Sequence, residues 1–549
     1  LNENLAGTQS SELRTGGQTA TFRLFDSLIG ANMDDRFEIQ DGAQVLPASI
    51  DGGTGANTLA GNATATAFSV TGTDEGTAML GVLNLAFTNV GTLEGGTAGD
   101  TFSFDVAGTL TGAIDGGVGA PNTVSGDANG NSFAINTANT GTINNGLGSV
   151  AFQRVQNLNG GAGVDVFVIN DRLDGSIDAA ADADAITLNS NADIGGSVQA
   201  GADADTIEIA GGATVSGSVL GEAGIDLFNL TGAGTISANL DGGSENDVFS
   251  LAGTVVLSGS ISGGTGTEDE LQGGDIASTY ELTNAGGVLQ VTDDSTVRVN
   301  SFDGIEKLTG GSAIDTFRFD AEGGVSSVSG GGGIDVLEGS NSANAIVISG
   351  AGAGTIDITV PATQVTFDEI ETINGRDGAD TFEVQSTGTI GQLIGGAGID
   401  GLTGSDEDET YNVTAPGAGT LMRTTGLLTT VNFTTMENLD GQGGADIFDI
   451  DALLDGNITG GTGNDLFDID GQVTGDLTGG VGVDDFQIDA NIGGDISGGL
   501  GDDTFTINAT VTGDVDGNEG TNTLTLDNTT GFILGELRNV IVTLVVNGT

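Results

Sequence analysis

Hydrophobic residues return along this chain at fixed intervals. Toward the C-terminus one apolar position recurs every 19 residues, at Phe448, Phe467, Phe486, Phe505 and Leu524. An aliphatic residue follows each of them two positions later, with a polar residue in between, as in the stretch DLFDID. Alternation of apolar and polar residues is typical of a strand with one buried face. The pattern therefore predicts a strand at the same place in every repeat.

A second, shorter strand is predicted in each repeat by stretches such as QVTGDL, and Gly-rich stretches such as GGTGND separate the two strands. Glycine adopts positive φ angles at little cost, which suits tight corners. One repeat is thus strand, corner, strand, corner. A single repeat cannot bury its apolar face alone, so successive repeats must stack. In-register stacking would place each Phe on the Phe of the next repeat.

A longer repeat separates the runs of short ones. It is marked by pairs of Phe 15 residues apart, at Phe22/Phe37, Phe87/Phe102, Phe152/Phe167, Phe302/Phe317, Phe367/Phe382 and Phe433/Phe448. The steps from Phe37 to Phe102 and from Phe317 to Phe382 are both 65 residues. We interpret this period as about three turns of a coil with about 21 or 22 residues per turn.

These intervals divide the chain into five segments. We predict long repeats of about 65 residues in 1–166, four short repeats of 19–21 residues in 167–248, three long repeats in 249–447 and four short repeats in 448–526. The apolar segment 527–549 lacks the Gly corner, and we expect it to be a C-terminal cap or a strand that docks on the next subunit.

The predicted fold is all-β. We expect a parallel β-solenoid, a β-roll or β-helix of stacked 19–22-residue rungs with no significant helix. Glycine makes up 99 of the 549 residues, and each glycine costs about 1 kcal/mol in a helix interior, which disfavours helix. An antiparallel sandwich also alternates, but it gives no reason for a constant period.

Acidic residues dominate the charge of the chain. It carries 77 Asp and Glu against 11 Lys and Arg, a formal net charge of −66. Nucleic acid and anionic membranes are held by basic residues, so we expect neither as a partner and expect cations instead. No apolar run in the sequence reaches the roughly 18 residues of a membrane span, so we expect no membrane insertion.

The residue types that most enzymes use are scarce. His and Cys are absent, so no disulfide is possible, and Lys307 is the single lysine. General acid–base catalysis draws mostly on His, and nucleophilic catalysis on Cys or an activated Ser. We therefore predict that the chain is not an enzyme. An enzyme that cleaves acidic polysaccharides with Asp and a basic residue is the remaining alternative.

A short motif accompanies the repeats. The strict pattern GGxGxD begins at six positions and each time lies directly before the principal strand, at Gly160–Asp165, Gly330–Asp335, Gly395–Asp400, Gly460–Asp465, Gly479–Asp484 and Gly498–Asp503. Three other corners lack the acid: Gly52 to Asn57 has Asn in place of Asp, and the stretches GGVGAP and GNEGTN have none.

The pattern GGxGxDxF resembles the calcium-binding nonapeptide of RTX proteins, a family of secreted bacterial toxins, proteases, surface-layer proteins and adhesins. The resemblance implies bound Ca²⁺, along one edge of the coil because most short repeats carry one motif per turn. The implied metal ligands are Asp165, Asp335, Asp400, Asp446, Gly460, Gly463, Asp465, Gly479, Gly482, Asp484, Gly498, Gly501 and Asp503.

The aspartates have two interpretations at this point. Stacked rungs are about 4.8 Å apart, which would align Asp465, Asp484 and Asp503 in a column. Like charges at that spacing repel by about 0.9 kcal/mol even in water, so a cation between them would be favourable. Ca²⁺ takes six to eight oxygens, and turn carbonyls would have to supply most of them. Alternatively, each Asp hydrogen-bonds a turn while bulk counterions screen the column.

The function expected from these features is structural. We predict a stiff, calcium-stabilised rod outside the cell, part of a filament, a surface layer or an adhesin stalk, that self-associates end to end. The alternative is a ligand-binding adhesin module, for which the irregular stretch around Lys307 is the candidate. The chain begins and ends inside its own repeat, so we expect a processed form or an excerpt of a longer array.

Overall fold

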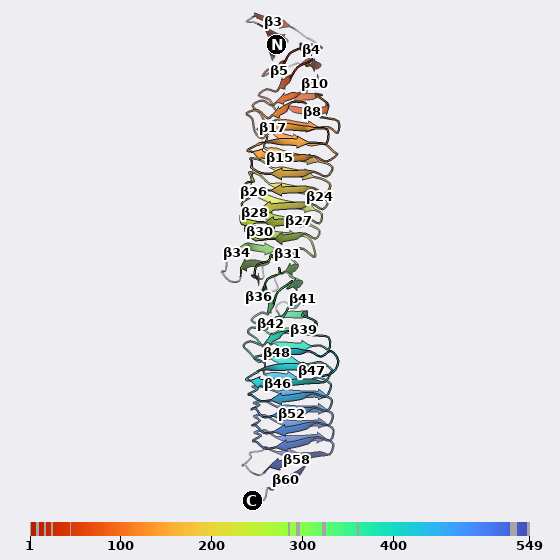
Figure 1. Cartoon of the computed structure of the whole chain (residues 1–549), viewed down its shortest axis with the longest axis vertical. Helices are drawn as coiled ribbons and strands as arrows, with labels where there is room; N and C mark the ends of the chain where they lie inside the picture. Colours follow the sequence, from red (N-terminus) through yellow and green to blue (C-terminus); the bar gives the residue numbers. More distant parts are fainter. Residues whose placement is uncertain are drawn as a thin grey trace. The chain divides into compact units, whose positions relative to one another are not determined.

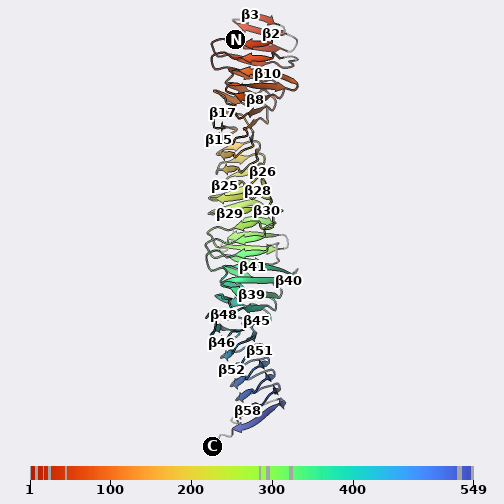
Figure 2. The same ribbon diagram turned by 90° about the vertical axis from the view of Figure 1, so that its right-hand side faces the viewer.

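The computed structural model describes residues 2–6, 10–15, 18–22, 26–43, 46–283, 286–291, 297–320, 325–359, 362–527 and 535–545. Throughout these residues the chain consists of strands and turns without helix, which confirms the all-β prediction. It divides into two compact units, the first formed by Leu1–Gly274 and Val297–Ile305, the second by Asp275–Thr296 and Glu306–Thr549. In each unit the strands are stacked as the rungs of a solenoid (Figures 1 and 2).

The C-terminal short repeats show the rung most simply. Every rung contributes one strand to each of two sheets, and neighbouring strands within a sheet are parallel. The first sheet contains β50 (Ile447–Ile450), β52 (Leu466–Ile469), β54 (Asp485–Ile488), β56 (Thr504–Ile507) and β58 (Asn522–Asp527). The second contains β51 (Ile458–Thr462), β53 (Leu477–Val481), β55 (Ile496–Leu500) and β57 (Val515–Glu519). The predicted parallel β-solenoid is thus confirmed.

Stacked phenylalanines fill the interior between these sheets. Phe448, Phe467, Phe486 and Phe505 occupy the same register position and have no exposed surface. Successive ring centroids are 5.1, 4.4 and 4.8 Å apart with nearly parallel planes. Tyr411 extends the stack at 4.9 Å from Phe448, and its hydroxyl donates to the Asp440 carbonyl. The predicted Phe ladder is therefore present, with offset or stacked rings in favourable contact.

The short repeats of the first unit are built in the same way. One sheet carries β19 (Val166–Ile169), β22 (Ala185–Leu188), β25 (Thr206–Ala210), β27 (Leu227–Thr231) and β29 (Val248–Leu251). The other carries β18 (Asn157–Gly161), β21 (Ile177–Ala180), β24 (Val198–Ala202), β26 (Thr214–Ala223), β28 (Ala233–Ser244) and β30 (Thr254–Gly264). All described neighbours in this run are parallel, and Phe228 stacks on Phe249 at 4.7 Å.

The long repeats differ from three plain turns of a coil, because they contain antiparallel strands. In the first unit β8 (Ala67–Gly72), β9 (Glu75–Leu80) and β10 (Leu83–Thr88) form a meander, and so do β15 (Ser132–Thr137), β16 (Thr140–Asn144) and β17 (Ser149–Gln153). In the second unit the meanders are β39 (Asn344–Gly350), β40 (Ala353–Thr359) and β41 (Ala362–Asp368), and β46 (Glu409–Ala415), β47 (Ala418–Arg423) and β48 (Thr430–Thr434). Consecutive meanders lie in opposite sheets, so both sheets gain strands alternately.

Each meander joins the parallel stack at both ends. β10 pairs in parallel with β6 (Ser49–Asp51), and β8 pairs in parallel with β12 (Thr101–Phe104), while β9 is antiparallel to both of its neighbours. Phe68 on β8 consequently stacks on Phe102 at 5.0 Å. The solenoid core therefore continues through the meanders, although the chain direction reverses within them.

The C-terminal segment continues the two sheets. β59 (Leu537–Arg538) pairs with β57, and β60 (Val540–Val545) pairs with β58, both in parallel. Of the segment predicted as a cap or docking strand, residues 528–534 and 546–549 lie outside the described residues. In the described part of the chain, no helix has the length and apolar character needed to cross a membrane.

Candidate site: buried aspartate columns at the corners

The GGxGxD corners depend on glycine for two reasons. Gly461 and Gly463 have φ angles of 105° and 146°, which side chains rarely adopt. A Cβ on Gly463 would also overlap the carbonyl oxygen of Gly444 on the preceding rung, and a Cβ on Gly482 would overlap that of Gly463. Successive corners thus stack with glycine Cα atoms directly against carbonyl oxygens, and the motif's glycines are required by both backbone angle and space.

The motif's aspartates point inward from these corners. Asp165, Asp335 and Asp400 are fully buried, and Asp465 is 2% exposed. The other predicted ligands, Asp446, Asp484 and Asp503, are equally buried, at 1% exposure each. Every predicted aspartate therefore lies inside the corner and not on a solvent-facing edge.

Aspartates of successive rungs are joined in columns by hydrogen bonds. The backbone N–H of Asp465 donates to Oδ1 of Asp484 at 3.0 Å, and that of Asp484 donates to Oδ1 of Asp503 at 3.0 Å. We call Asp446, Asp465, Asp484 and Asp503 the second-unit column. The first-unit column consists of Asp165, Asp184, Asp205, Asp226, Asp247 and Asp269, with donor–acceptor distances of 2.6 to 2.8 Å. The same hydrogen bond from a backbone N–H to Oδ1 of the next aspartate joins two separate pairs, Asp315/Asp335 and Asp380/Asp400.

Sequence reasoning missed many members of these columns. Asp184, Asp205, Asp226 and Asp247 sit in corners without the strict glycine motif, yet they occupy the same place. A signal for them exists, because each lies two residues before the buried Phe or Ile of its strand, as Asp484 precedes Phe486. The spacing Asp-x-apolar therefore includes the column members that GGxGxD misses.

Asparagine takes the column position at corners that lack the acid. The backbone N–H of Asp35 donates to Oδ1 of Asn57, that of Asp100 to Asn122, and that of Asp503 to Asn522, at 2.8 to 3.0 Å. The three corners that appeared degraded in the sequence thus retain the same inter-rung hydrogen bond.

The second oxygen of most column aspartates has no hydrogen-bond partner although it is buried. This holds among the described residues for Oδ2 of Asp165, Asp184, Asp205, Asp226, Asp247, Asp335, Asp380, Asp400, Asp446, Asp465, Asp484 and Asp503. An unpaired buried polar atom is costly, and a charged one more so. Such a regular set of orphan atoms requires an explanation.

Burial raises the pKa of these carboxyl groups, and their acidic neighbours raise it further. The pKa of Asp484 is about 7, with Asp465 and Asp503 adding to the effect of burial. That of Asp446 is about 8, where Asp465, Glu409 and Asp408 contribute. In the first-unit column the pKa values lie at about 6 for Asp165 and Asp226 and about 7 for Asp184, Asp205 and Asp247.

The donor geometry of the corners does not fit a calcium ion. Oδ1 of each column aspartate already accepts an N–H, and Oδ2 lies against the first glycine of its own motif, as Oδ2 of Asp465 does against Gly460. The carbonyls of Gly463 and its equivalents abut glycines of the next rung. Within the described residues, no group of three or more acidic side chains is placed to hold a metal ion. Calcium therefore stays a prediction of the motif, and the geometry favours hydrogen-bonded aspartates.

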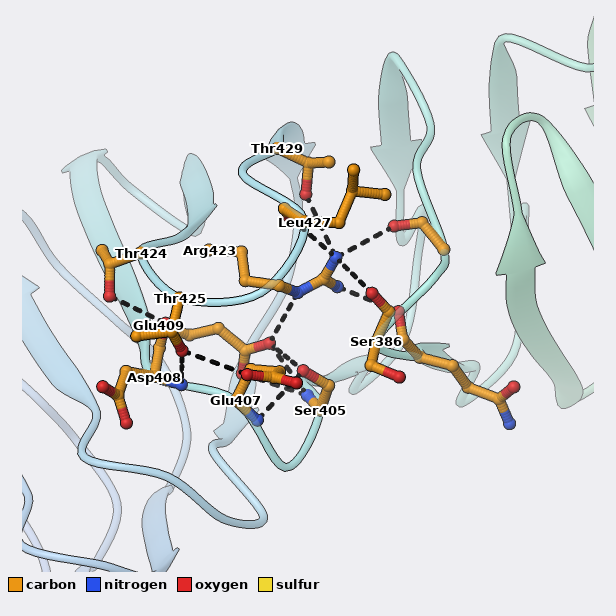
Figure 3. A network of polar contacts seen from close by, with 12 residues as sticks. Ser386, Ser405, Glu407, Asp408, Glu409, Arg423, Thr424, Thr425, Leu427 and Thr429 are labelled. Atoms are coloured by element: carbon orange, nitrogen blue, oxygen red, sulfur yellow. Dashed lines mark hydrogen bonds and ion pairs between the residues drawn. The ribbon is translucent and has the colours of Figure 1, made fainter.

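A buried ion pair ends the second-unit column (Figure 3). The backbone N–H of Glu409 donates to Oδ1 of Asp446, and its carboxylate lies 3.3 Å from Nε of Arg423. Ser405 donates to the same carboxylate. Arg423 also donates to the carbonyls of Gln385 and Ser386 on a neighbouring rung. The pair is buried and extensively hydrogen-bonded, and it ties the β46–β48 meander to the rungs on either side.

Lys307 lies beside a shallow depression in the outer face of the second unit. The depression has a volume of about 380 Å³ and is formed by β35 (Lys307–Thr309), β37 (Ser327–Ser329) and β41. Its polar lining includes Thr366 and Asp368. This is the place where the predicted ligand-binding alternative would have to act.

Comparisons with known proteins do not assign the chain. No protein-family model matches it, and no curated protein shows significant similarity to it. The resemblance to RTX proteins therefore rests on the GGxGxD corners and on the repeat period.

Proposed function

We propose that this chain is an extracellular structural protein, a stiff repeat rod that forms part of a filament, a surface layer or an adhesin stalk. The proposal is supported chiefly by the way in which the rungs of the C-terminal short repeats repeat the same internal contacts. Stacked Phe rings and hydrogen-bonded column residues each link a rung to the next, so that bending a unit would disturb both sets of contacts at once. Repeat proteins of this kind are stabilised by nearest-neighbour interfaces.

The surface chemistry is consistent with this role. A net charge of −66 favours solubility and makes the sides of neighbouring molecules repel each other. We therefore expect any self-association at the ends of the solenoid, where strand edges can pair. Because the sequence has no Cys, no disulfide contributes to the proposed stiffness. We propose a non-catalytic role, with end-to-end copies of the chain as the partner.

A ligand-binding adhesin module is the second candidate. The observation in its favour is the depression beside Lys307, the single lysine in a chain of 77 acidic residues. Lys307 is the basic group of this depression that an acidic ligand would contact. Acidic glycans are the class that we would test.

Electron microscopy and small-angle scattering of the purified chain test the structural role. We expect elongated particles, a fraction of them joined end to end as the concentration rises. Compact particles would contradict the rod. A glycan array provides the second test: binding of acidic glycans by the wild type and not by Lys307→Gln would favour the adhesin module.

A further inference from the structure

The asparagines in the columns show what the column position requires. In Asn522, Oδ1 accepts the N–H of Asp503, while Nδ2 donates to the carbonyl of Asn539, in the bend between β59 and β60, at 3.2 Å. In Asn122, Nδ2 donates in the same way to the carbonyl of Arg154 at 3.0 Å. Asn57 repeats the arrangement with the carbonyl of Asn89 at 2.9 Å. The position thus needs one acceptor and one donor.

Aspartate Oδ2 occupies the place of that donor. A Cβ built on Gly517 would touch both Nδ2 of Asn522 and the Asn539 carbonyl, and a Cβ built on Gly479 would touch both Oδ2 of Asp484 and the Gly498 carbonyl. The equivalent glycines of other rungs have the same pair of neighbours. A Cβ on Gly441, for example, would touch both Oδ2 of Asp446 and the Gly460 carbonyl. An ionised carboxylate would place a lone pair next to a carbonyl lone pair, which is repulsive.

We propose that the buried column aspartates whose Oδ2 accepts no hydrogen bond are carboxylic acids in the folded protein, with Oδ2–H donating to the neighbouring rung's carbonyl as the amide of Asn does. Asp35, Asp100 and Asp315 are not among them, because their Oδ2 accepts a backbone N–H. Each of the proposed acids takes one proton from water when its rung stacks and returns it when the rung separates. A proton then does at these rungs what the RTX resemblance assigns to calcium. The columns are then one part of the fold whose stability depends on pH.

Burial of Asp484 outweighs the one hydrogen bond given for its carboxyl group that favours the ionised form, which Oδ1 accepts from the N–H of Asp465. The charged groups that face it are Asp465 and Asp503, both acidic, and its Oδ2 has no hydrogen-bond partner. Burial holds its pKa at about 7, above the ordinary value of 3.8. Because the folded state binds the proton more tightly, this contribution to stability is complete below about pH 4 and is lost as the pH rises to about 7.

The test uses the full chain and the substitution Asp484→Asn, which keeps the acceptor and supplies the donor permanently. Hydrogen exchange, corrected for intrinsic rates, gives the opening constant of segment 448–526 from about pH 4 to about pH 7 in the presence of a chelator. In the wild type this constant should rise about tenfold more per pH unit than in Asp484→Asn, since the variant releases one proton fewer. At the upper end of that range the variant should be as well protected as the wild type, or better.

The control is Asp470→Asn, which makes the same substitution at an exposed position directly after β52, on the neighbouring rung. It should leave the pH dependence of segment 448–526 unchanged. Infrared spectroscopy of the wild type gives an independent measurement: a band of buried protonated carboxyl groups should be present near pH 6 and diminish toward pH 9. The absence of that band, or equal pH dependence in the wild type and Asp484→Asn, would overturn the proposal. So would protection that millimolar Ca²⁺ restores in the wild type and not in Asp484→Asn.

Discussion

Single glycines in one motif have different roles, which the run Gly330 to Asp335 makes testable. Gly333 has a φ angle of 148° and its Cβ would strike the Ala313 carbonyl, whereas a Cβ on Gly332 would meet nothing closer than 3.6 Å. We expect Gly333→Ala to destabilise its rung by at least about 1–3 kcal/mol, from backbone strain alone. Gly332→Ala should be within about 0.5 kcal/mol of the wild type or stabilising. Denaturant unfolding followed by segment-resolved hydrogen exchange measures both, and equal effects would contradict the assignment.

The phenylalanine ladder predicts a local response to a cavity. Phe486 is fully buried between Phe467 and Phe505, at 4.4 and 4.8 Å. Phe486→Ala should cost about 3–5 kcal/mol, because the neighbouring rings cannot close the space without breaking their own register. In a stack with nearest-neighbour coupling the loss of protection should be largest in the two adjacent rungs. The control Gln487→Ala, on the exposed side of the same strand, should change little. Even loosening of the whole chain would count against the ladder.

At the level of elements, the rungs could be predicted and the meanders could not. The alternation at Phe467 and Ile469 defines a half-buried strand, and its period implies stacking, whatever the rest of the chain does. The strands β8, β9 and β10 alternate in the same way, so the pattern does not reveal that β9 runs backward. Direction is decided in the turns, where Asp74 and Gly81 have φ angles of 58° and 59°. A period of 65 residues is compatible with either topology.

The candidate site was predicted in part for a related reason. The position of Asp484 in the corner follows from the motif, but the partner of each oxygen depends on how far the next rung is shifted. The motif also directed attention to its glycines, and so Asp205 and Asn522 were overlooked as members of the same columns. The hydrogen-bond partners of the carboxyl oxygens and the membership of the columns both depend on the register between rungs, which a single repeat does not encode.

The Arg423–Glu409 pair connects the β46–β48 meander to the neighbouring rungs. Arg423→Met should cost about 3–5 kcal/mol, since it leaves the Glu409 carboxylate buried without a cation. Burial already raises the pKa of Glu409 despite Arg423. The variant should therefore regain stability at lower pH, where Glu409 can be protonated. The double variant Arg423→Met/Glu409→Met should be markedly more stable than the single one.

Thermal unfolding across pH measures these effects. The control is Arg172→Met, which removes an exposed partner of Asp174 and should cost no more than about 1 kcal/mol. A loss in Arg423→Met as small as that of the control would show that the buried pair does not hold the meander in place.

The whole molecule combines two acidic populations with different consequences for stability. Exposed carboxylates give most of the charge of −66, and their mutual repulsion weakens with salt. Salt does not screen the interactions of the buried column carboxyl groups in this way, because these groups are out of contact with solvent. Lowering the pH reduces the repulsion between exposed carboxylates and also protonates the buried column carboxyl groups. A pH profile at low salt therefore does not distinguish the two effects. High salt distinguishes them, since the screening length falls to about 3 Å at 1 M and the repulsion between exposed carboxylates is then screened.

We therefore expect the full chain, in chelator and 1 M NaCl, to unfold at a higher temperature at about pH 5 than at about pH 8. The sign follows from the folded-state pKa values, about 6 for Asp165, about 7 for Asp484 and about 8 for Asp446, all above the ordinary value of 3.8. The folded state binds more protons, so stability is lost as the pH rises through this range. Melting temperatures that are flat or increasing between these pH values at high salt would mean that the columns are ionised when folded. Carboxylates stacked on carboxylates would then have to be stabilised by a bound cation, as the motif predicts.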